Sequence, residues 1–123
     1  MQQYSIKTKA GEVLFSAVCG SFKQCVDLAV AFKIPLTGAD LSGENLGEDY
    51  TQSERYFQGD FVQGAQMAGA ELEGAQLQGT QLISANLQGA FLAGADFTGA
   101  NAANINVTGA DLSRTSNTRA YGI

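Results

Sequence analysis

The stretch from Gly64 to Arg114 decides the fold. In groups of five, residues 64–113 read GAQMA GAELE GAQLQ GTQLI SANLQ GAFLA GADFT GANAA NINVT GADLS. A large apolar residue closes the fourth position of nearly every unit, and a small residue, usually alanine, comes two positions before it. Ten consecutive units in one register identify a repeat protein. The large positions are Met67, Leu72, Leu77, Leu82, Leu87, Leu92, Phe97, Val107 and Leu112.

A period of five fits neither an α-helix, with about 3.6 residues per turn, nor a β-strand, whose side chains alternate from one residue to the next. It fits a chain that turns a corner in every unit while two side chains of the unit face inward. Glycine suits such a corner, and Ser84 and Asn104 take its place in two units. Ala102 and Ile105 exchange volumes between neighbouring inward positions, which keeps the interior filled. The sequence therefore predicts a square coil whose turns stack and hydrogen-bond to each other.

Units of the form A(D/N)LxG, such as 39–43, 85–89 and 95–99, resemble those of pentapeptide-repeat proteins. The resemblance is most evident over 36–46 and 64–114. It implies an all-β repeat fold, a right-handed quadrilateral β-helix of about 3–4 coils. It also implies no catalytic residues, no cofactor, and function through binding other macromolecules. The best characterised relatives protect DNA gyrase from inhibitors and are dimers shaped and charged like duplex DNA.

Residues 1–35 predict a β-hairpin followed by a helix. The segments 4–8 and 13–18 read as two strands joined by a turn. A capping box begins at Ser21, apolar residues then keep helical spacing, and Pro35 ends the helix. The end of a β-helix exposes its core and an open sheet edge, so we expect this element to act as a cap. The alternative is a separate recognition module.

The solenoid is expected to span 36–114, with an acidic excursion at about 47–58 that fits no unit. This excursion is either a solvated loop or a binding loop on a rigid scaffold. Residues 115–123 are expected to leave the repeat as a tail that caps the last coil or pairs with a second molecule. The acids in and around the excursion, opposed only by Arg55, are Asp40, Glu44, Glu48, Asp49, Glu54 and Asp60.

A slip of one residue separates the first coil, marked by Leu36, Leu41 and Leu46, from the units that follow Gly64. If Phe61 faces inward, Gly64 is the extra residue. If Val62 faces inward, Asp60 falls in a small inward position, and burying an unpaired carboxylate is costly. We favour Phe61 as the inward residue.

Because the interior is filled, function must lie on the outer faces, the excursion or the ends. Residues 20 apart share a face in a square coil of four units. Phe91 occupies an outward position that normally holds Asp, Asn or Gln, and carboxylates surround it on its face. An exposed aromatic residue with such a rim is typical of an interface anchor, although single apolar residues on a surface are common. The candidate partner-binding residues are Glu48, Asp49, Tyr50, Glu54, Glu71, Glu73, Phe91 and Asp111.

Composition excludes most chemistry. The chain has no histidine, and Cys19 and Cys25 form no CxxC motif, so neither a metal site nor a general base is expected. The two cysteines read as small buried residues. The N-terminus does not read as a signal peptide, and no apolar run in the sequence approaches the roughly 18 residues of a spanning helix, so we expect a cytoplasmic protein that does not contact membranes.

We therefore predict a non-catalytic binding protein with a protein partner, no direct contact with nucleic acid, and homodimerisation through an end or a face of the β-helix as one option. The main alternative is an acidic DNA mimic that inhibits a DNA-binding enzyme, such as a gyrase-like topoisomerase or a defence nuclease complex. Matching the charge density of DNA over the ten units would need about seven carboxylates. The stretch supplies four. A structural module that assembles end to end is a third option.

Overall fold

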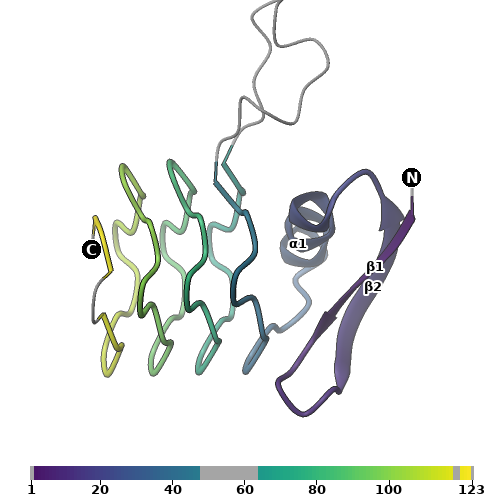
Figure 1. Cartoon of the computed structure of the whole chain (residues 1–123), viewed down its shortest axis with the longest axis horizontal. Helices are drawn as coiled ribbons and strands as arrows, with labels where there is room; N and C mark the ends of the chain where they lie inside the picture. The colour runs from purple at the N-terminus through teal and green to yellow at the C-terminus, as the bar shows by residue number, and fades with distance from the viewer. Residues whose placement is uncertain (1, 48–63, 118–119, 123) are drawn as a thin grey trace, which may run out of the picture.

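The computed structural model describes residues 2–47, 64–117 and 120–122, with a strand–strand–helix element at one end and a stack of coils extending from it (Figure 1). Strand β1 (Gln2–Lys7) pairs antiparallel with β2 (Val13–Cys19). Helix α1 (Phe22–Ala31) follows, and the Ser21 hydroxyl caps it by accepting a hydrogen bond from the backbone N–H of Gln24 at 3.1 Å. The predicted hairpin-and-helix start is confirmed.

Four ladders of parallel β-bridges hold the coils together. From Gln66 onward, a residue in an outward position pairs with the residue 20 positions later, and successive ladders are five residues apart. Each ladder is one side of the coil, so the repeat forms a β-helix solenoid. The ladders are Asp40–Gln76–Asp96–Ser116, Asn45–Gln81–Asn101–Tyr121, Gln66–Asn86–Asn106 and Glu71–Phe91–Asp111.

Two side chains of each unit fill the interior, as the sequence predicts. The large and small inward residues from Ala65 to Ala102 are all buried, and the hydroxyl of buried Thr80 donates to the carbonyl oxygen of Leu77 at 2.8 Å. Toward the C-terminal end the inward residues, including Ile105 and Leu112, are only half-buried. The interior is therefore a solid apolar column that becomes more exposed in its last coil.

Polar groups of the cap pair with the edge of the first coil. The carbonyl oxygen of Lys7 accepts a hydrogen bond from the Asp40 N–H at 2.7 Å, and Oδ1 of Asp27 accepts one from the Gln66 N–H at 2.8 Å. The Nζ of Lys23, a buried side chain, donates to the Gly47 carbonyl oxygen at 2.6 Å. Burial raises the pKa of the Asp27 carboxyl. These bonds occupy the backbone groups that a preceding coil would pair in the rest of the stack.

The chain leaves and re-enters the first coil at one corner. Bridges before this corner join residues 36 apart, whereas the bridges after it join residues 20 apart. The Ala65 N–H donates to the Leu46 carbonyl oxygen at 2.8 Å, just as Ala85 donates to Leu82 one coil later. Gly47 and Gly64 thus take adjacent places in the corner. The end of the predicted excursion at about residue 58 and the placement of Phe61 and Val62 lie outside the described residues.

The backbone keeps the repeat beyond Arg114. Ser116 bridges to Asp96, and Tyr121 bridges to Asn101, both with the 20-residue spacing. The prediction that the chain leaves the repeat at Thr115 is therefore wrong for the backbone. The sequence signal ends earlier because Asn117, at the next large inward position, is polar and exposed.

Candidate functional site

One side of the solenoid carries three of the predicted partner-binding residues, Glu71, Phe91 and Asp111, on one ladder. Glu73 follows Glu71 by two residues, and we call these four residues the Phe91 side. The Phe91 side chain is 48% exposed, as its outward position predicts. Glu71 and Asp111 lie directly before and after it on the same ladder and are exposed. Half-buried Glu73 accepts a hydrogen bond from the Thr37 hydroxyl at 3.3 Å.

The other four candidates, Glu48, Asp49, Tyr50 and Glu54, lie outside the described residues. The described part of the chain places the two ends of their segment, Gly47 and Gly64, in the corner between the Asn45 and Gln66 ladders. These ladders and the Phe91 side belong to different sides of the coil. The structure therefore brings together the candidates of the Phe91 side, and the grouping of the other four stays a prediction.

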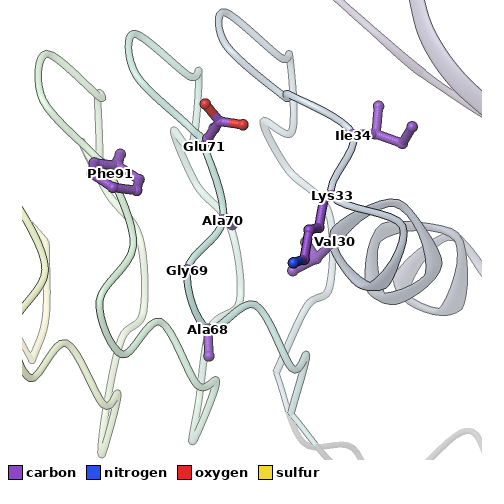
Figure 2. Close-up of a pocket in the computed structure, with 8 residues that line it drawn as sticks. All are labelled: Val30, Lys33, Ile34, Ala68, Gly69, Ala70, Glu71 and Phe91. Atoms are coloured by element: carbon purple, nitrogen blue, oxygen red, sulfur yellow. The ribbon is translucent and has the colours of Figure 1, made fainter.

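A groove adjoins the Phe91 side, and sequence reasoning missed it. Its volume is about 290 Å³. Figure 2 shows the corner from Ala68 to Ala70 as its floor, with Phe91 on one side and the end of helix α1 on the other. The lining residues are Val30, Lys33, Ile34, Ala68, Gly69, Ala70, Glu71 and Phe91.

The way helix α1 ends shapes the helical wall of this groove. Lys33 adopts a left-handed backbone conformation with φ of 59°, and its N–H donates to the Val30 carbonyl oxygen at 2.9 Å. The next N–H, that of Ile34, returns to the Ala29 carbonyl oxygen at 2.9 Å. This αL termination turns the chain from the helix into the first coil. As a result, Val30 and Lys33 line the groove opposite Phe91 (Figure 2).

Outward aspartates stabilise the corners of the coil. Oδ1 of Asp96 accepts hydrogen bonds from the hydroxyl of Thr98 at 2.6 Å and from its N–H at 2.9 Å. Asp40 and Asp111 make the same two bonds with the serine two residues later. These hydroxyl and N–H donors lower the pKa of all three carboxyl groups. The charge of Asp111 on the Phe91 side thus also has a structural role, and that carboxylate remains ionised near neutral pH.

Replacing Thr98 by valine is expected to raise the pKa of Asp96 toward its ordinary value of 3.8, because the hydroxyl donor to its carboxylate is lost. A carboxyl whose folded pKa is depressed stabilises the fold above its unfolded pKa, and this contribution is lost as pH falls through the folded pKa. The variant should therefore lose less stability than the parent on acidification below about pH 4. NMR titration of the Asp96 carboxyl measures the shift directly.

Thr108→Val is the matched control, because Thr108 occupies the same position after Asn106, a residue that does not titrate. An unchanged Asp96 pKa in Thr98→Val would contradict the assigned hydrogen bond. A shift of the Asp96 pKa in Thr108→Val would show that the effect is not local.

The other titratable groups with a shifted pKa within residues 2–47 and 64–117 lie in the first coil and the cap. Glu44 occupies a small inward position of the first coil, where burial and the charge of Asp40 raise its pKa. Cys19 and Cys25 are free and buried, as predicted, and burial with the adjacent Cys19 thiol raises the pKa of Cys25 to about 11. Across the described ranges there is no cluster of metal-ligating side chains and no helix long and apolar enough to cross a bilayer.

Comparison with known proteins agrees with the ladder geometry. A family model described as pentapeptide repeats matches residues 62–87 and 75–114, with eight copies of the repeat. A search of curated proteins found no match. Within the matched range, the described residues 64–114 turn large and small side chains inward and contribute outward residues to all four ladders. Residues 62–114 of this chain therefore belong to the pentapeptide-repeat family, and a strand–strand–helix element precedes the solenoid.

Proposed function

We propose that this chain is a non-catalytic binding protein, whose solenoid presents the Phe91 side and an acidic segment at 47–58 to a protein partner. The observation that carries the proposal is the position of Phe91. A large aromatic ring is about half exposed at a ladder position where the other sides carry mostly polar residues. Proteins of this family are generally structural or binding proteins rather than enzymes.

The backbone beneath Phe91 supports a role as a preformed anchor. Its N–H donates to the Ala70 carbonyl oxygen, and its carbonyl oxygen accepts from the Leu72 N–H, both at 2.8 Å. A residue fixed in this way loses little conformational freedom when a partner covers it. Aromatic residues also supply much of the binding energy at protein interfaces. The proposal includes the acidic segment at 47–58 only because its negative charge would favour association with a basic partner.

The distribution of carboxylates favours contact with a protein partner over mimicry of duplex DNA. Among the described residues, Asp40 and Asp96 lie on one side of the coil, whereas Glu71, Glu73 and Asp111 lie on the Phe91 side. Duplex DNA presents a charge for about every 1.7 Å of its axis. The described sides carry fewer charges and interrupt them with Phe91, Gln76 and Ser116.

The proposal extends to the geometry of the scaffold, which we infer to be a right-handed β-helix of about 3–4 coils. The bridges that keep a 20-residue spacing to Tyr121 support this number of coils. A stack of that length is a short rigid rod, with coils separated by roughly 4.7–4.9 Å. Its sides are then each long enough for one compact contact, as the Phe91 side requires.

Replacing Phe91 by aspartate is expected to reduce capture of the partner by roughly 30-fold, the loss that corresponds to about 2 kcal/mol at an interface hot spot. The measurement is affinity capture from cell lysate with the tagged full chain, followed by titration of the captured protein. The melting temperature should stay unchanged, because the side chain is already half exposed.

Gln81→Asp is the control, because Gln81 has an exposed outward position on a different side of the coil. Equal capture by the parent and Phe91→Asp would place the binding surface elsewhere. If duplex DNA abolishes the capture, the alternative function as an acidic DNA mimic would be favoured instead.

A further inference from the structure

The geometry points to a basic segment of a protein partner as the occupant of the groove beside Phe91. The segment would place one apolar side chain over the corner from Ala68 to Ala70 and set lysine or arginine side chains against the carboxylates of the Phe91 side. This inference rests on the proposed function and specifies the chemistry of the partner. It also adds to that function a second contact surface, formed by helix α1.

The floor of the groove selects an apolar side chain. Part of its backbone is already paired within the solenoid: the Gly69 N–H donates to the Gln88 carbonyl oxygen at 2.8 Å, and the Ala70 N–H donates to the Met67 carbonyl oxygen at 3.0 Å. The Ala70 carbonyl oxygen accepts from the Phe91 N–H at 2.8 Å. A polar group buried against this floor would lose its water without gaining these partners, which is costly. An apolar group gains from the same burial.

The groove is open because small residues occupy one corner of the solenoid. Ala68 and Gly69 are exposed, so nothing larger fills the space between Phe91 and the end of helix α1 (Figure 2). One coil later, the residue equivalent to Ala68 is Gln88. The walls are largely apolar because Val30, Ile34 and Phe91 contribute to them. The groove therefore offers a concave site for one apolar side chain rather than a flat apolar surface.

The charges around the groove select basic flanking residues. The Phe91 side contributes the carboxylates of Glu71, Glu73 and Asp111, and the donors from Ser113 keep Asp111 ionised. The opposite wall contributes the ammonium group of Lys33. A cationic segment is thus attracted by the Phe91 side and repelled at the helix, so its basic residues should lie toward Glu71 and Asp111. The net charge of −5 over the whole chain favours the same partner during encounter.

The test is selection of a random displayed peptide library on the immobilised full chain, followed by affinity measurement with the selected peptides. We expect these peptides to combine an apolar anchor with an excess of lysine and arginine. Ala68→Phe, which fills the groove, and Glu71→Lys, which reverses the rim charge, should each weaken binding at least tenfold. Thr108→Phe and Gln81→Lys introduce the same side chains at the equivalent position two coils later and on another side, and should leave binding unchanged. Melting curves check that each variant is folded.

The outcomes separate this inference from the proposed function. Peptides that bind Ala68→Phe as well as the parent, that lack an excess of basic residues, or that cannot be selected at all would overturn the basic-segment inference. If such peptides or the captured partner still depend on Phe91, the proposed binding role of the Phe91 side stands. If binding depends on neither Ala68 nor Phe91, both conclusions are wrong.

Discussion

Replacing Gly64 by alanine is expected to lower the free energy of unfolding by about 3 kcal/mol, an effect at the upper end of the range for overpacking. A Cβ at this position would lie 2.7 Å from the Ser84 carbonyl oxygen and 2.9 Å from the Ala85 nitrogen. Both are backbone atoms of the next coil, which its own ladder hydrogen bonds hold in place, so neither can move aside cheaply. Chemical denaturation of the parent and variant measures the difference.

Gly79→Asn is the control. It changes a corner glycine whose backbone angle φ, rather than a close contact, favours glycine. Gly79 has φ of 65°, and nothing lies within 4 Å of an added Cβ. Asn104 already adopts φ of 57° at an equivalent corner, and asparagine tolerates this region better than most residues. We therefore expect a loss below about 1 kcal/mol. Equal losses in the two variants would contradict the close stacking of Gly64 on the next coil.

Replacing Leu77 by alanine is expected to cost about 3–4 kcal/mol, because it removes a large side chain from a solid interior that cannot collapse around the cavity. Leu77 is fully buried, and its carbonyl oxygen accepts a hydrogen bond from the buried hydroxyl of Thr80. Coils stacked on both sides restrict any relaxation of the backbone. Urea denaturation, with comparison of the slopes as well as the midpoints, measures the loss.

Leu112→Ala makes the same chemical change at a large inward position of the last coil. Leu112 is only half-buried, so the change removes less apolar contact and leaves a space that water reaches. We expect its cost to be less than half that of Leu77→Ala. Similar costs at both positions would show that the interior is not the continuous packed column described above.

The repeat could be predicted from the sequence because each unit specifies its own geometry. A corner residue, a small inward residue and a large inward residue recur without reference to distant parts of the chain, as in the unit from Gly74 to Gln78. The grouping of Glu71, Phe91 and Asp111 followed from the same arithmetic, since a period of 20 residues sets which positions share a side. The hairpin and helix were predictable from alternation and capping.

The groove was not predictable, because it depends on how two separately predictable elements pack. Lys33 and Ala68 are far apart in sequence, and only the placement of helix α1 on the first coil brings them to one groove. The pairing of Asp27 with Gln66 was hidden for a similar reason. A charged residue on the polar face of a short helix reads as solvated until the coil edge beside it is known.

The closure of the first coil across Gly47 and Gly64 was not predictable from the sequence either. The side-chain pattern left two placements for the one-residue slip before Met67, and neither of them predicted that Gly64 lies beside Gly47 in one corner. Glycine in that place looked like an ordinary corner residue or an extra one. Its actual requirement is the close approach of the Ser84 backbone, which involves a residue of the next coil and leaves no local signature.

The adjacency of Gly47 and Gly64 in the first coil has an evolutionary consequence. Because the coil closes across them through the bond between Ala65 and Leu46, the stacking of every later coil is independent of how many residues intervene. The entropic cost of a longer connection grows slowly, by about 0.6 kcal/mol for each doubling of length. Selection is therefore free to lengthen, shorten or exchange that intervening sequence, as in a grafted epitope, while the solenoid that carries it is inherited unchanged.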